Sequence, residues 1–318
     1  MFTDLTSDPF PFSEPWEGES LDDRLAVLTG PAPRVAWFCE SPNSVSFRYR
    51  VFNLIEAVRS GPRPLSATWF EMADLEPLLQ RLGQLETLVL SRVRYCERIA
   101  WLVAAAKAQG VRVLFECDDL VFDTRYTHLV YDTLAQGPDY GAPWDWWFAL
   151  IGRTEAAARL CDGGITTNAF LAARLAEVVA GPVTVVPNFM NHRQLAVSEQ
   201  LLVAKQSRSF VADQPLTIGY FSGTPTHSHD FAIVQQPLAR LLHRDPDVRL
   251  RIVGCLDHLG PLANFHDRLE CLPFHDWLNL QRLIAEVDIN IAPLQDNAYT
   301  NAKSPLKFFE AAAVGTWT

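Results

Sequence analysis

Hydrophobic and polar positions repeat one rhythm along most of this chain: an apolar run, a polar turn, then a helical pattern. The apolar runs are continuous, which is typical of strands buried on both faces of a parallel sheet. They predict the following strands: residues 35–39, 67–71, 85–91, 111–117, 164–167 and 183–187, and then 216–221, 248–254 and 288–293.

Helical patterns fill the intervals between these strands. One covers residues 47–61, another covers 95–110 with Gly110 at its end, and a third starts after Asn168 as N-cap. Strands that alternate with helices predict βαβ units, whose ligands collect at the carboxyl ends of the strands. In a protein with two such units, those ends can face each other across a cleft.

The rhythm pauses once, over a mostly polar stretch that we interpret as a linker, residues 191–213. The chain therefore divides into two α/β halves, residues 31–190 and 214–318, each expected to form a Rossmann-like domain. Residues 1–30 precede both halves as a proline-rich, acidic arm, which we expect to be flexible.

Composition and charge narrow the classes of protein. The net charge is −10, and the arm contributes seven acids against one arginine. The remaining body is only mildly acidic, which argues against a nucleic-acid partner. No apolar stretch is long enough for a membrane span, and the N-terminus lacks the features of a signal peptide. We expect a cytoplasmic protein whose six scattered cysteines are reduced.

Four loops at expected strand ends carry candidate chemistry. In the first, "CESPNSVSFRYR" (residues 39–50), Ser44 and Ser46 are candidate caps, and Arg48 and Arg50 lie in the first helical turns. Arginine suits bidentate recognition of phosphate or carboxylate. The two arginines are either an anion-binding pair or part of a solvated face, and the sequence leaves both interpretations open.

The second loop follows the strand in "FECDDLVFD", residues 115–123. Asp118 and Asp119 at its end suit a base, an acceptor for sugar hydroxyls or a metal ligand. The alternative is that one of them simply caps the next segment. A metal site is disfavoured because no third carboxylate or histidine stands at a suggestive spacing.

The third loop, "YFSGTPTHSHDF" (residues 220–231), opens the second half. Its backbone N–H groups and hydroxyls at Ser222, Gly223 and Thr224 suit a phosphate. His227 and His229 beside Asp230 invite a zinc or catalytic-triad interpretation, but further ligands and a nucleophile elbow are missing.

The fourth loop leads into the last helix through "NAKSPLKFFEAAAVG". Ser304 is the expected N-cap, with Lys303 before it and Lys307 in the first turn. Lysines at a helix N-terminus oppose its dipole unless an anion is present, so they indicate a phosphate site. Glu310 suits a ribose diol, or else an i,i+3 pair with Lys307.

Together these segments resemble the GT-B glycosyltransferases of the large retaining group called family 4. The strongest part of the likeness is "NAKSPLKFFEAAAVGT" with the preceding "VDINIAPL" and the upstream "YFSGTPTHSHDF". The first half is similar in "SFRYRVFNLIEAV", "CDDLVFD", "ARLCDGGITTNAFLAARLAE" and "VTVVPNFMN". Within the group, the chain looks most similar to bacterial transferases of surface-polysaccharide and O-antigen assembly.

This resemblance implies a retaining hexosyltransferase that moves sugar from a nucleotide-sugar donor to a glycan, lipid-linked or protein acceptor. It implies no cofactor and no metal, because basic side chains and helix ends neutralise the leaving diphosphate. Glu310 matches the second glutamate of the family's E-x7-E motif, which holds the ribose. The other implied donor residues face the diphosphate and sugar: Ser222, Gly223, Thr224, His227, Lys303, Ser304 and Lys307. Asp118 and Asp119 match the loop beside the reacting sugar, and Arg48 is expected to assist from across the cleft.

The chain also departs from the family pattern. The first position of E-x7-E is Ala302, so the carboxylate that usually grips the donor sugar is missing. The N-terminal loop has "ESPNSVS" in place of a frequent glycine pair. The sequence stops at "GTWT", where relatives continue, and we expect a truncated second domain or a partner that completes it.

Two rival functions and one surface feature stay open. A non-catalytic scaffold is favoured by Ala302 and the short end, and a sugar-nucleotide epimerase shares the same fold. The tryptophans 144, 146 and 147 suit an acceptor platform or a peripheral contact with the inner membrane face. A core or inter-helix role is the simpler interpretation.

Overall fold

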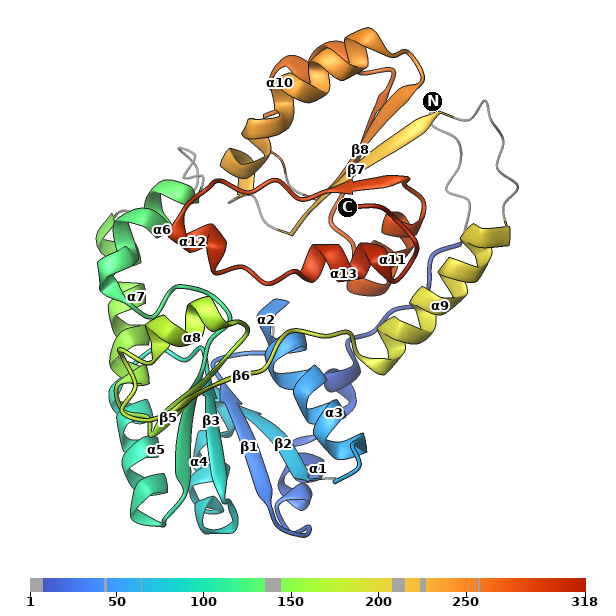
Figure 1. Cartoon of the computed structure of the whole chain (residues 1–318). Coiled ribbons are helices and arrows are strands. Elements are labelled where there is room, and N and C mark those ends of the chain that lie inside the picture. The colour runs from blue at the N-terminus through green and yellow to red at the C-terminus, as the bar shows by residue number, and fades with distance from the viewer. Residues whose placement is uncertain are drawn as a thin grey trace.

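The computed structural model describes residues 8–42, 45–63, 65–134, 144–207, 215–223, 227–254, 256 and 258–318. It contains a six-stranded and a four-stranded sheet, both entirely parallel. Figure 1 shows the larger sheet below, the smaller one above, and the last two helices between them. The prediction of two α/β halves with parallel sheets is confirmed.

The first domain is built on strands in the order β2-β1-β3-β4-β5-β6. Their bounds are β1 Arg34–Cys39, β2 Ser66–Glu71, β3 Thr87–Ser91, β4 Arg112–Glu116, β5 Gly163–Thr166 and β6 Val183–Val185. Its helices are α1 Leu21–Val27, α2 Val45–Phe47, α3 Asn53–Ser60, α4 Leu75–Leu79, α5 Glu97–Ala108, α6 Thr127–Thr133, α7 Trp144–Ala158 and α8 Ala169–Leu175.

The second domain has the strand order β10-β7-β8-β9. The strands are β7 Leu216–Ser222, β8 Val248–Gly254, β9 Leu269–Leu272 and β10 Ile289–Ile291. The helices of this half are α9 His192–Ser207, α10 Ser228–Arg244, α11 Trp277–Ala285, α12 Ala298–Asn301 and α13 Leu306–Ala312.

Each sheet is covered by apolar side chains on both faces, as the continuous apolar runs predict. In β1, Ala36 and Phe38 join one buried cluster, whereas Trp37 and Cys39 join another. The same division separates Tyr220 from Phe221 in β7. The alternation follows from the two-residue period of a strand.

The strand orders place one topological switch point in each sheet. In the first domain the chain goes from β1 outward to β2 and returns on the other side as β3. In the second it goes from β7 through β8 to β9 and returns as β10. Ligands of open α/β sheets bind outside the carboxyl ends of the strands at such points. The crevices between β1 and β3, and between β7 and β10, are therefore the expected ligand sites.

The chain between the domains differs from the expected polar linker. Residues 192–207 form α9, which packs Val197 and Leu201 against α11 within the core of the second domain. The helical pattern is weak because polar Gln194 and Ser198 are buried while apolar Leu195 and Val203 are exposed. Strand β9 was not predicted either, since its short sequence is only partly buried.

The N-terminal arm also differs from the flexible arm that was expected, over the residues the structure describes. Phe10 exchanges backbone hydrogen bonds of 2.8 and 3.0 Å with the Asn279 side chain on α11. Further along, Trp16 is buried against Phe47 and Phe52 of the first domain. The arm thus contacts both domains, and aromatic residues within the acidic segment provide the anchors.

The three tryptophans at the start of α7 have different surroundings. Trp147 packs against the core of the first domain, as the simpler interpretation predicted. Trp144 and Trp146 are 41% and 47% exposed, so neither lies in the core, but the Trp144 ring contacts Tyr131 of α6, which is an inter-helix contact. Within the described part of the chain, no helix is both long and apolar enough to span a membrane.

Replacing the buried anchor of the arm should destabilise the fold. We expect Trp16→Ala to lower the free energy of unfolding by about 3 kcal/mol, because it leaves a cavity beside two aromatic rings. Urea denaturation followed by circular dichroism measures this change. Trp317→Ala is the matched control, since that side chain is 80% exposed. Equal losses in the two variants would contradict the packing of the arm.

Candidate functional site

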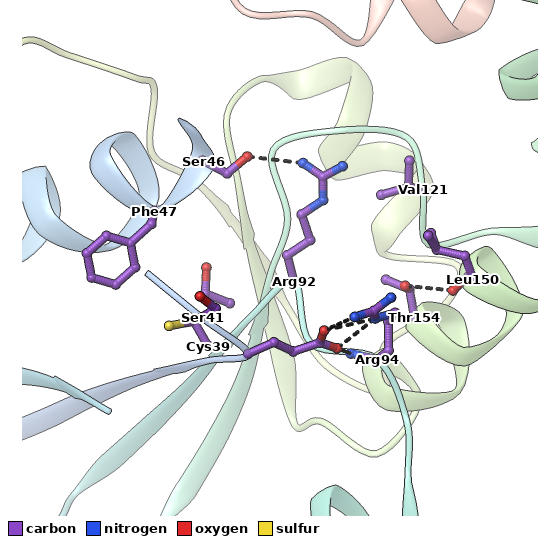
Figure 2. Close-up of a pocket in the computed structure, with 11 residues that line it drawn as sticks. Cys39, Ser41, Ser46, Phe47, Arg92, Arg94, Val121, Leu150 and Thr154 are labelled. Carbon is purple, nitrogen blue, oxygen red and sulfur yellow. Dashed lines mark hydrogen bonds and ion pairs between the residues drawn. The ribbon is translucent and has the colours of Figure 1, made fainter. Parts of the chain in front are cut away.

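A cavity of about 350 Å³ opens at the switch point of the first sheet. Its walls come from the residues that follow β1 and β3, including Glu40, Ser41, Arg92 and Arg94. The Arg92 guanidinium points toward Ser46, whereas Arg94 lies apart from that pair (Figure 2). Phe47, Val121 and Leu150 supply apolar surface, so the cavity combines charged groups with apolar walls.

Arg92 has an uncommon backbone conformation. Its φ is +53°, which is uncommon outside glycine and costs free energy that surrounding contacts must offset. Its N–H donates to the Glu116 carbonyl at 2.8 Å, which fixes this bend at the end of β3. Its guanidinium donates to Ser46 Oγ at 3.0 Å and to Asp118 Oδ1 at 3.3 Å. The bend therefore directs a cation across the strand ends.

Asp118 and Asp119 lie on opposite sides of the same network. Asp118 Oδ2 accepts a hydrogen bond from Ser46 Oγ at 2.8 Å. Asp119 reaches the second domain, where Lys303 Nζ donates to its two oxygens at 3.0 and 2.9 Å and Tyr299 donates at 3.1 Å. Neither aspartate caps a helix, so the capping alternative is not realised.

The pairing of Asp119 with Lys303 shifts the pKa of both groups. Burial alone would raise the pKa of Asp119, but Lys303 and Arg92 lower it below its ordinary value. Burial alone would lower the pKa of Lys303, but Asp119 raises it above its ordinary range. Both groups therefore stay charged over the whole neutral range. In this structure Lys303 is bound to a carboxylate of the other domain.

Glu310 is the centre of a second buried cluster between the domains. Its Oε1 accepts hydrogen bonds from the Tyr49 hydroxyl and from Gln194 Nε2, the latter at 3.1 Å. Arg48 Nη2 lies 3.7 Å from the same oxygen, and its guanidinium stacks over the Tyr49 ring. All three contacts are to Oε1, so Oε2 takes part in none of them. Arg48 of the first domain and Glu310 of the second are thus brought together at the domain boundary.

Lys307 lies at the carboxyl end of β7, where its Nζ donates to the Phe221 carbonyl at 2.6 Å. It does not take the alternative role of an i,i+3 partner for Glu310. Burial is the largest influence on Lys307 and lowers its pKa, although the nearby Glu310 and Asp230 oppose that shift. An anion bound beside Lys307 would favour the charged form of its amine and raise its pKa.

The remaining candidates on the donor side are more dispersed. Ser222 is buried at the end of β7, Gly223 is exposed beside it, and Thr224 lies outside the described residues. His227 Nδ1 contacts Asp230 Oδ2 at 3.0 Å, so this imidazole nitrogen already has a partner at the start of α10. Among the described residues, no group of three or more His, Cys, Asp or Glu side chains is placed to hold a metal ion.

Ser304 corrects the expected helix cap. Helix α13 begins at Leu306 with Pro305 in the cap position and no side-chain cap. The Ser304 hydroxyl instead accepts from Asn188 Nδ2 of the first domain at 3.0 Å. The sequence pattern could not reveal this, because the competing partner is more than a hundred positions away.

Several residues of the site were missed by the sequence patterns. Arg92 and Arg94 closely follow the predicted strand 85–91, and basic residues at a strand end were a usable signal. The roles of Tyr49 and Tyr299 had no such signal, since their partners belong to the other domain, and Gln194 bonds to Glu310 more than a hundred positions away. Arg50, which had been paired with Arg48, is buried in an ion pair with Glu116 at 2.5 Å.

Comparisons with known proteins give remote similarities only. No protein-family model matches the chain, and no curated protein sequence matches it either. Solved structures with a similar arrangement include an α,α-trehalose-phosphate synthase from Burkholderia xenovorans in complex with glucose-6-phosphate. It has 10% identity and a TM-score of 0.46, and the match covers 86% of this chain and 83% of that one.

Two further solved structures are similar at the same level. A UDP-glucosyltransferase from Polygonum tinctorium has 13% identity and a TM-score of 0.44, covering 91% of this chain and 79% of that one. A UDP-GlcNAc 2-epimerase from Methanocaldococcus jannaschii has 8% identity and a TM-score of 0.42, covering 89% and 82%. Similarity this distant assigns no activity to the chain.

The Asp119–Lys303 pair gives a prediction with a defined pH window. A depressed carboxylate pKa contributes stability above the unfolded pKa of about 3.9, and loses it as pH falls through the folded value. We expect Asp119→Asn to lower the free energy of unfolding by about 2 kcal/mol at neutral pH. The difference from the original chain should shrink in acid. Urea unfolding at several pH values tests this, and a difference that does not vary with pH would refute the pairing.

Proposed function

We propose that this chain is a GT-B type glycosyltransferase that uses a nucleotide-sugar donor. One observation carries the proposal: the switch-point crevices of two parallel sheets meet at a boundary lined by paired charges. The first sheet contributes the cavity lined by Arg92, which bonds to Asp118, and the second contributes Lys307 and Glu310. Two such crevices suit a reaction in which two ligands exchange one group.

The donor is proposed to bind at the crevice between β7 and β10. Glu310 Oε2 would accept from the ribose hydroxyls while Oε1 stays fixed by Tyr49 and Gln194. Lys307, beside the end of β7, would meet the diphosphate together with the backbone at Ser222 and Gly223. Cations held in place before the reaction stabilise a leaving diphosphate without a metal ion. Metal independence is therefore part of the proposal.

The acceptor is proposed to occupy the cavity of the first domain, with its reacting hydroxyl near Asp118. That carboxylate is held by Ser46 and Arg92, which fix its orientation. Asp119 would orient Lys303 rather than accept a proton, because its pKa is depressed by two cations. Retention of configuration belongs to the proposal through the resemblance to family 4.

Ala302 supports an altered grip on the donor sugar. Its side chain is buried in the core of the first domain, and its carbonyl accepts from Asn168 Nδ2 at 2.9 Å. A glutamate at this position would bury an unpaired charge, which is costly. The polar groups nearest in sequence are Asn301 and Lys303, so we propose that contacts to the sugar come from other residues than in the family pattern.

Nucleotide binding is the first test of the function. UDP, GDP and dTDP, with their sugars, should be screened by thermal shift, because a ligand in excess raises the melting temperature. For the nucleotide that binds, Lys307→Ala should raise the Kd about tenfold, equivalent to about 1.4 kcal/mol. Lys107→Ala is the matched control, since Lys107 pairs with Asp162 on the outer surface. Unchanged affinity in Lys307→Ala would remove the donor site from this crevice.

The proposed ribose contact can be tested with matched nucleotides. Glu310→Gln should weaken binding of the ribonucleoside diphosphate about tenfold, because one ribose hydroxyl loses a charged acceptor. It should have little effect on the 2′,3′-dideoxy analogue. Isothermal titration calorimetry of both ligands measures the difference. Equal losses for both would show that Glu310 acts only through the fold.

Product analysis separates transfer from its closest alternative. Incubation of the nucleotide sugar without acceptor should leave its sugar configuration unchanged, whereas an epimerase would invert one centre. Nucleoside diphosphate release that rises with added acceptor supports transfer. Nucleotide binding with no turnover under any condition would favour a scaffold.

A further inference from the structure

A second cavity of about 270 Å³ lies next to the first at the carboxyl ends of the strands. It is lined by Glu40, Met72, Arg94, Cys96, Ile99 and Arg153. Glu40 and Arg94 also line the first cavity, so these two side chains form a common wall. The first cavity is called proximal, because its lining residues contact the loop that bonds to the second domain, and the second is called distal.

The contacts at the rims set the order of the two cavities. The proximal cavity includes Arg92 and Ser46, which bind Asp118, and the adjacent Asp119 binds Lys303 of the second domain. The distal cavity is lined by none of these residues. A ligand that reacts near the domain boundary and fills both cavities must therefore place its reacting part in the proximal one.

The common wall carries no net charge. Arg94 Nε donates to both Glu40 oxygens at 2.9 Å, its Nη2 contacts Glu40 Oε2, and its backbone N–H donates to Oε1 at 2.8 Å. Burial alone would raise the pKa of Glu40, but the Arg94 bonds hold it below its ordinary value. The carboxylate is thus fixed and charged; Arg94 bonds to it directly, and the charge of Arg153 makes a smaller contribution to lowering its pKa.

Arg153 gives the distal cavity an excess positive charge. It lies on α7, where its Nε donates to the Tyr95 carbonyl at 2.8 Å and its own carbonyl accepts from Tyr95 N–H at 2.7 Å. These bonds anchor the base of the guanidinium. In the part of the chain that the structure describes, Arg153 forms no ion pair. Arg153 is solvent-exposed, and among the described residues its terminal nitrogens have no hydrogen-bond or ion-pair partner.

We propose that the acceptor of this chain carries an anionic group, phosphate or carboxylate, attached next to its reacting sugar unit. The sugar unit occupies the proximal cavity, and the anionic group enters the distal cavity and binds Arg153. A guanidinium fixed at one nitrogen suits this role, because its remaining donors match two oxygens of such an anion. The inference rests on the proposed function and names the acceptor class for the same site.

Binding of small probes tests the inference directly. Hexose 1-phosphates and methyl hexuronides should be compared with neutral methyl hexosides by isothermal titration calorimetry, using the full chain saturated with its nucleoside diphosphate. The nucleotide keeps phosphate probes out of the donor crevice. At least one anionic probe should bind at least tenfold more tightly than its neutral counterpart. Which anionic series binds distinguishes a phosphate from a carboxylate.

Three variants show where the charge is recognised. Arg153→Ala should remove the tenfold preference while leaving the weak binding of the neutral hexoside unchanged, and Arg153→Lys should restore part of it. Arg159→Ala is the matched control on the same helix, because Arg159 pairs with Glu155 away from both cavities.

The outcomes separate this inference from the proposed function. Equal binding of anionic and neutral probes, no effect of Arg153→Ala, or no binding of any probe would overturn the acceptor class. Loss of probe binding in Lys307→Ala but not in Arg153→Ala would locate the anion in the donor crevice and also overturn it. None of these results changes the nucleotide titrations, on which the proposed function is judged separately.

Discussion

The ion pair between Asp119 and Lys303 is the constraint on which the arrangement of the two domains depends. Each group lies at the end of an element in its own domain, and each is largely removed from water. A charge in such a position is stable only when paired, so the boundary must keep the two domains in register. Tyr299 also donates a hydrogen bond to Asp119. A second contact between the domains is the hydrogen bond from the Tyr49 hydroxyl to Glu310.

A ligand bound at this boundary would change the contacts that the two lysines now make. Lys303 is held by the first domain and Lys307 by a carbonyl at the end of β7, so a diphosphate must compete with or join existing contacts. The N-terminal arm adds a further link, because Phe10 binds α11 while Trp16 is buried in the first domain. Opening of the crevices would therefore strain both the charged boundary and the arm, which suits domain closure around ligands.

Much of the fold could be predicted because strands and helices leave local signals. Continuous apolar runs identified β1, β3, β4, β7 and β8, and Gly110 follows the end of α5 as expected, where it has a positive φ. Helix α9 was missed, since it buries polar Gln194 and exposes apolar Leu195 and Val203, which removes the amphipathic pattern. Ser304 was wrongly placed as a cap, because a local pattern cannot include a partner such as Asn188 in the other domain.

The sequence by itself determined the two parallel sheets and the loops at their carboxyl ends, since periodicity and chain order fix both. It therefore pointed to Asp118, Asp119, Lys303, Lys307 and Glu310 as chemically important. Only the tertiary structure decided which of these groups meet, because charged side chains take the partners that packing brings within reach. The Asp119–Lys303 and Glu310–Tyr49 pairs form because the fold brings these residues within bonding distance. The positive φ of Arg92 and the two adjoining cavities likewise exist only once the strand ends are assembled.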